Sequence, residues 1–248
     1  FPRASILQRN DLPSRHGEGL PLEDELLAGD PPAGRVPFRE RGMTFLADLA
    51  GGQKTGFFLD QRENRHLVRG LGGGKSVLNL FSYSGAFGVA ALAGGASRVT
   101  HVDVSAPALA LARENHAANG QDLSRVETVA ADAFEDLRAR VARGETWDVV
   151  VTDPPAFAKK TLDVDRACRG YKDVNRLALK LLAPGGLLLA CSCSGPVSAD
   201  LFQKVLFAAS LDAGVPVRLL ERRGAGPDHP VSIDCPETEY LKAFLLSR

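Results

Sequence analysis

Cysteine is scarce in this chain of 248 residues, and its few cysteines do not form a metal-binding pattern. No two of them form a Cys-x-x-Cys pair, and no histidine stands beside them at metal-ligand spacing. We therefore expect no metal, and we favour a reduced, cytoplasmic setting in which thiols stay free. The four residues are Cys168, Cys191, Cys193 and Cys235.

The chain also lacks an excess of charge of either sign. Its 30 Lys and Arg residues balance 30 Asp and Glu residues, whereas nucleic-acid-binding proteins often carry a basic excess. Only a local basic patch would therefore support an RNA partner. We expect no signal peptide, because no basic start precedes an apolar run. We also expect no membrane contact, because the most apolar region, 177–194, is broken by Pro184-Gly185-Gly186.

Hydrophobic residues make up 44% of the chain and charged residues 24%, which suits one large folded domain with a small appendage. We expect residues 1–60 to form a small β-rich α+β appendage and a candidate RNA-facing surface. Within it, 36–40 and 43–47 read as a β-hairpin around Arg41-Gly42. Residues 61–248 would form the main domain.

From Ser76 onward, apolar strands alternate with helices. This alternation predicts an α/β fold with a Rossmann-like, mostly parallel sheet of about seven strands and helices on both faces. Such sheets bind ligands outside the carboxyl ends of their strands. The expected strands are 77–81, 98–104, 126–130, 147–152, 187–191, 215–220 and 239–246; the expected helices are 61–69, 88–93, 107–119, 134–143 and 171–182.

Four successive strands end in residues that suit a nucleoside site. Gly85 lies in the turn after the first strand, where glycine allows close approach of a ligand. Asp103 ends the second strand, where a carboxylate can accept hydrogen bonds from both ribose hydroxyls. Asp132-Ala133 follow the third strand, placed to contact an adenine, and Asp153 opens an Asp-Pro-Pro loop after the fourth. Each feature alone is weak, but their order predicts one nucleoside-binding cleft.

A nicotinamide dehydrogenase is the main competitor for this cleft. Its fingerprint requires Gly-x-Gly-x-x-Gly at the first turn, but positions 83, 85 and 88 are Tyr, Gly and Gly. S-adenosylmethionine carries no pyrophosphate and does not need that first glycine. The turn therefore favours a methyl donor over a dinucleotide.

From about residue 6 to its end, the chain resembles the class I S-adenosylmethionine-dependent methyltransferases. More narrowly, it resembles the bacterial large-subunit (23S) rRNA cytosine-5 methyltransferases. The most specific stretch is Lys-Thr-Gly-Phe-Phe-Leu-Asp-Gln-Arg at 54–62. Members of that family usually carry a further N-terminal RNA-binding domain of the PUA type. The chain shows none and begins at Phe1, as expected of a truncated chain or a shorter relative. The matching stretches are 52–65, 78–88, 153–159, 169–175, 192–195 and 228–230.

The resemblance implies S-adenosylmethionine as cofactor and 23S rRNA, or a ribosomal assembly particle, as partner; a homodimer is possible. The implied cofactor-binding residues are Thr55, Arg62, Phe81, Ser82, Tyr83, Gly85, Asp103, Val104, Asp132, Ala133 and Asp153. The implied substrate-binding residues are Lys54, Phe157, Lys159, Arg169, Tyr171 and Lys172.

Carbon 5 of cytosine is a weak nucleophile, so its methylation needs a thiolate that adds to carbon 6 and a group that holds or protonates ring nitrogen 3. The family pattern matches Cys193 as the nucleophile and Asp153 as the acid. Cys191 is the rival, but it lies deeper in its strand and suits a core position. The related two-cysteine pattern has a second cysteine directly after the prolines, where this chain has Ala156. Another base must therefore take the carbon 5 proton.

Several residues keep two interpretations. Phe157 either stacks on a flipped base or packs in the core. Residues 159–180 hold seven basic and three acidic side chains, a local excess of four, which is either a solvated face or a phosphate-binding surface.

Alternative functions are methylation of a guanine ring nitrogen in rRNA, which needs no thiol, a non-catalytic RNA-binding factor, and a small-molecule methyltransferase.

Overall fold

The computed structural model describes residues 4–10, 14–31, 33–52 and 55–248. Contacts within the chain divide it into two compact units, Phe1–Phe58 and Leu59–Arg248. No helix in the described residues is long and apolar enough to cross a membrane.

The first unit contains two antiparallel strand pairs and one short helix, α1 (Ser14–Gly17). Strand β1 (Ile6–Gln8) pairs with β2 (Glu25–Ala28), and β3 (Val36–Glu40) pairs with β4 (Met43–Ala47).

The β3–β4 pair is the predicted hairpin. Arg41 and Gly42 both have positive φ, 47° and 80°, the backbone that two-residue hairpin turns favour. The rings of Phe38, Phe45 and Phe57 pack together with centroids 4.8–5.9 Å apart. This aromatic cluster forms a small core within the first unit.

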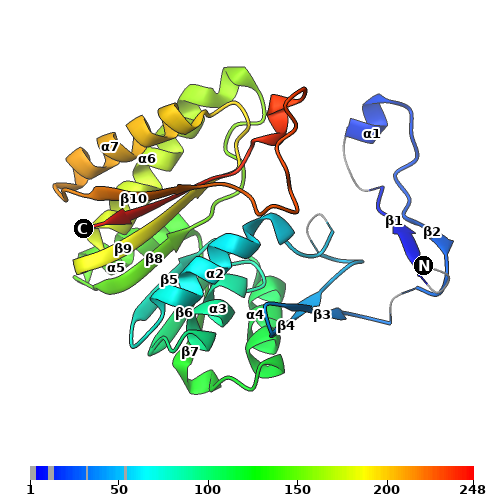
Figure 1. Cartoon of the computed structure of the whole chain (residues 1–248), viewed down its shortest axis with the longest axis horizontal. Coiled ribbons are helices and arrows are strands. Elements are labelled where there is room, and N and C mark those ends of the chain that lie inside the picture. Colours follow the sequence, from blue (N-terminus) through cyan, green and yellow to red (C-terminus); the bar gives the residue numbers. More distant parts are fainter. Residues whose placement is uncertain (1–3, 11–13, 32, 53–54) are drawn as a thin grey trace. The chain divides into compact units, whose positions relative to one another are not determined.

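The second unit is a seven-stranded sheet in the order β10-β11-β9-β8-β5-β6-β7 (Figure 1). The pairs β5–β6, β6–β7, β5–β8 and β8–β9 are parallel, and β11 runs antiparallel to both of its neighbours. The predicted mostly parallel α/β sheet is confirmed. Its strands are β5 (Ser76–Leu80), β6 (Arg98–Asp103), β7 (Val126–Ala130), β8 (Trp147–Thr152), β9 (Leu182–Ser192), β10 (Arg218–Arg223) and β11 (Lys242–Ser247).

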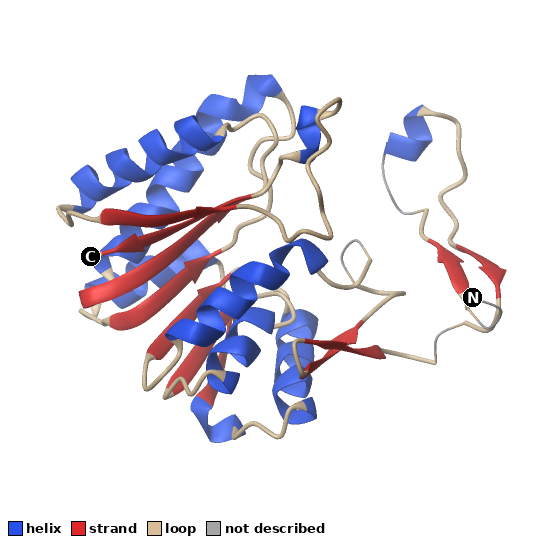
Figure 2. Ribbon diagram, in the orientation of Figure 1, coloured by secondary structure: helices blue, strands red, loops and turns tan. Residues whose placement is uncertain are grey.

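Helices cover both faces of this sheet (Figure 2). Helices α5, α6 and α7 pack on one face, and α2, α3 and α4 on the other. Residues alternate between the two cores along β9: Leu188 and Ala190 face the first layer, and Leu189 and Cys191 face the second. The helices are α2 (Arg62–Leu71), α3 (Ala86–Ala93), α4 (Ala106–Ala118), α5 (Ala133–Ala142), α6 (Val164–Lys180) and α7 (Ala199–Ala213), with short 3-10 turns η1 (Leu59–Gln61), η2 (Leu123–Arg125), η3 (Thr161–Asp163) and η4 (Pro236–Thr238).

Strand β5 lies at the point where the strand order reverses. The chain continues from β5 to β6 and β7 on one side, and then crosses to β8 and β9 on the other. Open α/β sheets bind ligands outside the carboxyl ends of the strands at such a switch point. The turns after β5, β6 and β8 therefore border the expected site.

Several elements differ from the sequence expectation. Helix α6 begins at Val164 rather than at 171, and β10 and β11 begin three residues later than expected. Helix α7 was not anticipated, although Ser198 caps its start through Oγ, which accepts from the Leu201 N–H at 3.2 Å, and Gly214 closes its end with φ 66°. Strand β9 begins at Leu182 rather than at 187. Its register with β8 shifts after Trp147, and this irregularity accommodates the glycine-rich stretch that was expected to precede the strand.

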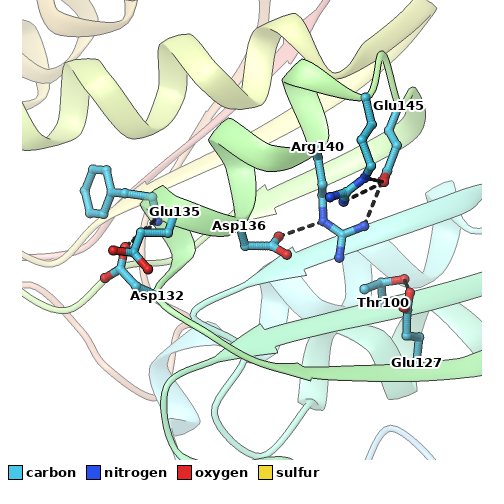
Figure 3. Close-up of polar contacts among 9 residues, drawn as sticks. Thr100, Glu127, Asp132, Glu135, Asp136, Arg140 and Glu145 are labelled. Atoms are coloured by element: carbon cyan, nitrogen blue, oxygen red, sulfur yellow. Dashed lines mark hydrogen bonds and ion pairs between the residues drawn. The ribbon is translucent and has the colours of Figure 1, made fainter.

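A buried ion-pair cluster fixes α5 against β8 (Figure 3). The Arg140 guanidinium donates to Asp136 at 2.6 Å and to Glu145 at 2.8 Å, and it lies 5.7 Å from the centre of the Trp147 ring. Because Arg140 is only 5% exposed, loss of both carboxylate partners would leave a buried charge without compensation. The cluster thereby ties α5 to the segment that leads into β8.

Two buried histidines join α4 to the sheet beneath the turn that follows β5. His101 and His116 are fully buried, with their Nε2 atoms 2.9 Å apart. The side-chain nitrogen of Asn79, Nδ2, lies 3.2 Å from His101 Nδ1, and His116 Nδ1 lies 2.5 Å from the side-chain oxygen of Gln121, Oε1. If the Asn79 amide donates to His101, His101 donates to His116 and His116 to Gln121. This chain of donors requires both rings to be neutral.

We predict that this pair makes the protein sensitive to acid. Burial is the main cause that lowers the pKa of His116 from 6.5 to about 4, and burial also lowers the pKa of His101. The unfolded chain therefore binds protons that the folded chain excludes, and stability present above pH 6.5 is lost as the pH falls towards 4. For His116 the loss is about 3 kcal/mol.

Chemical denaturation between pH 7 and pH 4.5 measures this loss, with His116→Gln as the matched variant. The free energy of unfolding should fall less steeply with pH in the variant than in the parent. Equal slopes would show that His116 does not titrate on unfolding as expected.

Candidate functional site

The turn after β5 has an unusual backbone. Phe81, Tyr83 and Gly85 have φ angles of 55°, 45° and 73°, in the left-handed region that residues other than glycine rarely adopt. Bulky residues stay there only where the surroundings enforce it, and such positions gather at functional sites. The turn therefore has the features of a binding loop.

Ser82 gives this turn an unused polar group. The side chain is 7% exposed, and the Ser82 N–H donates to the Val102 carbonyl at 3.1 Å. Its Oγ is buried and has no hydrogen-bond partner within the described residues. A buried hydroxyl without a partner costs free energy, so a ligand that bonds to it would be stabilised. This observation fits the predicted adenosyl cofactor.

Asp103 stands at the carboxyl end of β6, beside the turn. Its Oδ2 accepts from the Tyr83 N–H at 2.8 Å, and its Oδ1 accepts from the Ser105 N–H at 2.9 Å. A carboxylate offers about four acceptor positions, so each oxygen can still accept one hydroxyl. The two backbone bonds hold Asp103 in place to receive a ribose, as its predicted role requires.

The start of α5 borders the same edge of the sheet. Asp132 is the N-cap, and its Oδ1 accepts from the N–H groups of Phe134 and Glu135 at 2.9 and 3.1 Å (Figure 3). Its present role is therefore that of a helix cap. Ala133 is 3% exposed, whereas Val104, directly after Asp103, is 73% exposed. Val104 offers an apolar surface suited to one face of an adenine ring.

The carboxylate of Asp153 follows β8. Gln61, in η1, is 3% exposed, and its Nε2 donates to Asp153 Oδ1 at 3.0 Å. The side-chain oxygen of Gln61, Oε1, accepts from Asn64 Nδ2 at 2.7 Å, and this bond fixes the orientation of the Gln61 amide. Gln61 and Asn64 thus hold one oxygen of Asp153 and set the direction of its carboxyl group.

Cys193 lies just beyond β9 and faces the Asp-Pro-Pro loop. Its Sγ is 3.9 Å from the Pro154 carbonyl oxygen, so thiol and loop share one edge of the sheet. Cys191 is fully buried, and burial first, then the nearby Asp153 charge, raises the pKa of its thiol well above the usual value. The half-buried Cys193 is therefore better placed than Cys191 to act as a nucleophile.

The backbone around Cys193 is held by its neighbour Ser194. Ser194 Oγ lies 2.8 Å from the Tyr171 hydroxyl and accepts from the Ala158 N–H at 3.0 Å. One hydroxyl thus joins the end of β9, the loop after β8 and helix α6. This three-way junction fixes Cys193 relative to Asp153.

The residues predicted to bind RNA are not all accessible. Tyr171 is 0% exposed, with its hydroxyl bonded to Ser194, so it cannot present its ring to RNA. Phe157 is half-buried, and its ring centroid lies 4.7 Å from that of Tyr171. Lys159 and Arg169 are exposed, and Lys172 pairs with Asp212 of α7 at 2.9 Å.

Three predicted residues remain: Lys54, Thr55 and Arg62. Thr55 is exposed and belongs to the first unit, and Lys54 lies outside the described residues. Arg62, at the start of α2, pairs with Glu63 and Asp228, each at 3.0 Å. Its guanidinium therefore joins α2 to the loop between β10 and β11.

Sequence reasoning missed two residues of the site. Gln61 stands inside the most specific matching stretch, but a sequence cannot show that its amide meets a carboxylate 92 positions away. Lys242, at the start of β11, is 5% exposed, and its Nζ donates to the Ser194 carbonyl at 2.6 Å. A single lysine in the otherwise apolar stretch 241–246 was the available signal.

The second unit is an α/β fold with a thiol and a carboxylate at one edge of its sheet, and comparison with known proteins identifies its family. A family model described as S-adenosylmethionine-dependent methyltransferase matches residues 18–247. A ribosomal RNA large subunit methyltransferase I from Serratia proteamaculans is 47% identical over 244 residues, covering 98% of this chain and 62% of the relative. The chain thus spans about three fifths of that relative's length.

Solved structures show the same fold. A protein from Streptococcus mutans, described as a SAM-dependent methyltransferase, is 29% identical with a TM-score of 0.82, covering 91% of this chain and 58% of that protein. A methyltransferase structure complexed with SAH is 30% identical with a TM-score of 0.82, covering 91% and 59%.

The chain therefore belongs to the S-adenosylmethionine-dependent methyltransferase family. The resemblance seen in the sequence is confirmed at that level, and with it the cofactor.

Proposed function

We propose that this protein transfers a methyl group from S-adenosylmethionine to carbon 5 of a cytosine in large-subunit (23S) rRNA. The observation that carries the proposal is the Cys193 thiol lying 3.9 Å from the Pro154 carbonyl of the Asp-Pro-Pro loop. The name of the 47% identical relative supports the choice of RNA. Ribosomal RNA as substrate would place the protein in the cytoplasm.

The cofactor would bind across the turn after β5 and the end of β6. Asp103 would accept the ribose hydroxyls, Ser82 Oγ would take up a polar group, and Val104 with Asp132-Ala133 would border the adenine. The exposed side chain of Val104 supports this placement, as does Ser82 Oγ, which has no hydrogen-bond partner in the described part of the chain. Bound S-adenosylmethionine supplies an electrophilic methyl group beside the base.

Cys193 and Asp153 would activate the cytosine. The Cys193 thiolate adds to carbon 6 while Asp153 holds or protonates nitrogen 3, so the electron pair of the 5,6 double bond becomes available at carbon 5. After methylation, carbon 5 loses its proton, the double bond forms again and the sulfur–carbon bond breaks. The cysteine returns unchanged.

RNA would approach over the loop after β8. Lys159 and Arg169, which are exposed, would contact phosphates, and the half-buried Phe157 would offer part of its ring to a flipped base. Buried Tyr171 would support Phe157 from behind. Thr55, Lys54 and Arg62 remain predicted contributors, and a homodimer remains a prediction.

Mass spectrometry of nucleosides tests this function. In a strain that lacks the gene, 5-methylcytidine in 23S rRNA should fall relative to the parent, and the parental gene should restore it. A gene carrying Cys193→Ala should not. Loss of a methylguanosine instead would favour the ring-nitrogen alternative, and unchanged nucleosides in all strains would argue against rRNA methylation.

A further inference from the structure

Lys242 is a buried cation at the catalytic edge of the sheet, and the next four residues of its strand are apolar. Its side chain is 5% exposed, and it pairs in register with Ser192 of β9. A buried ammonium is costly unless other groups compensate for the lost hydration. Its position therefore calls for a role beyond packing.

Two backbone carbonyls hold the ammonium in a fixed position. Lys242 Nζ donates to Ser194 O at 2.6 Å and to Tyr240 O at 2.8 Å. An ammonium has three N–H groups, so these bonds leave one for another acceptor. Because Ser194 directly follows Cys193, the charge is fixed beside the backbone that carries the thiol.

The charge of Lys242 interacts with Cys193. Burial is the main cause that lowers the pKa of Lys242 to about 8, and an anionic Cys193 and Glu239 oppose that shift. The interaction is mutual. A thiolate at Cys193 stabilises the protonated form of Lys242, and the Lys242 ammonium stabilises the thiolate through the same attraction. At neutral pH the amine is mostly protonated and can serve as a counter-ion.

Other ionisable groups interact with Cys193 but are uncharged at neutral pH, because burial raises the pKa of each. Tyr171, Tyr240 and Cys191 interact electrostatically with Cys193 and would be anions when ionised. Two carboxylates nearby are held by neutral donors: Asp60 accepts from the Tyr240 hydroxyl at 2.7 Å, and Asp153 accepts from the Gln61 amide. Lys242 therefore supplies a positive charge that none of these groups offers to a Cys193 thiolate.

We propose that Lys242 is a positioning residue that holds Cys193 as a thiolate, ready to add to the base. This inference rests on the proposed function, since it gives the nucleophile its counter-ion. The thiol proton leaves to solvent before the RNA binds, and Lys242 keeps its own proton throughout. When the sulfur–carbon bond breaks at the end of the reaction, the thiolate returns to the same ammonium.

The pH dependence of alkylation tests the proposal without RNA. The intact chain is treated with iodoacetamide from pH 5 to pH 10, and modification of Cys193 is followed by peptide mass spectrometry. Lys242→Met and Lys242→Gln remove the charge, and Gln keeps an amide NH2 group that can donate to the carbonyls. Lys204→Met is the matched control, because Lys204 is exposed on α7 and pairs only with Asp200 among the described residues.

Both Lys242 variants should alkylate Cys193 about three- to fivefold more slowly at pH 7, with the midpoint of the pH profile about one unit higher. Lys204→Met should match the parent. An unchanged midpoint in a folded Lys242 variant would overturn the proposal. So would a parental Cys193 midpoint no lower than that of exposed Cys235, a comparison that needs no variant. Because alkylation involves no RNA, failure of cytosine methylation would leave this result standing.

Discussion

Replacing Cys193 with alanine should abolish methylation of cytosine while leaving the cofactor bound. Loss of a covalent nucleophile lowers turnover by roughly 10³-fold or more, because carbon 5 stays unactivated without addition at carbon 6. Cys193 does not belong to the turn after β5 or to the end of β6, so cofactor affinity should change little. Transfer of a labelled methyl group to 23S rRNA and calorimetry with S-adenosylmethionine measure the two effects.

Cys191→Ala is the matched control for this experiment. Cys191 is fully buried among apolar residues of the second core, so its truncation should affect stability more than turnover. Persistent methylation by Cys193→Ala would show that the covalent route is wrong. Loss of turnover in Cys191→Ala alone would exchange the assigned roles of the two thiols.

Replacing Asp153 with asparagine should lower turnover by roughly 10²–10⁴-fold, the usual contribution of a positioned acid. Asparagine keeps an oxygen that can accept from Gln61 Nε2, which now bonds Asp153 at 3.0 Å. The loop should therefore keep its shape, while the group that donates a proton to nitrogen 3 is lost. Single-turnover assays on 23S rRNA measure the change.

Asp200→Asn serves as control, because Asp200 is an exposed residue of α7 that pairs with Lys204. It should retain parental turnover and thermal stability. If Asp153→Asn were as active as Asp200→Asn, Asp153 would have no role in activating the base, and its contact with Gln61 would be structural.

Local sequence patterns predicted the sheet well. The hairpin at 36–47 and strands β7 and β8 have the predicted limits, because turn residues and apolar runs act over a few positions. Helix α7 was missed although Ser198 and Gly214 mark its ends. The glycine-rich stretch at 184–186 suggested that the strand starts at 187, but this stretch lies within β9, where the pairing with β8 is irregular.

The site was predictable only in part, since its residues meet through distant contacts. Order along the chain placed Gly85, Asp103 and Asp153 at successive strand ends. It could not show that Lys242 reaches the carbonyl of Ser194, 48 positions away. Nor could it separate surface from core within one helix: Arg169 is exposed, whereas Tyr171 is buried with its hydroxyl on Ser194.

Trapping the covalent adduct tests the central claim most directly. With S-adenosylmethionine and 23S rRNA containing 5-fluorocytidine, carbon 5 carries fluorine in place of the proton that must leave, so the enzyme cannot be released. The account predicts a denaturation-resistant protein–RNA complex, with the nucleotide mass on the peptide that contains Cys193. A complex through another residue, or efficient methylation with no complex, would contradict it.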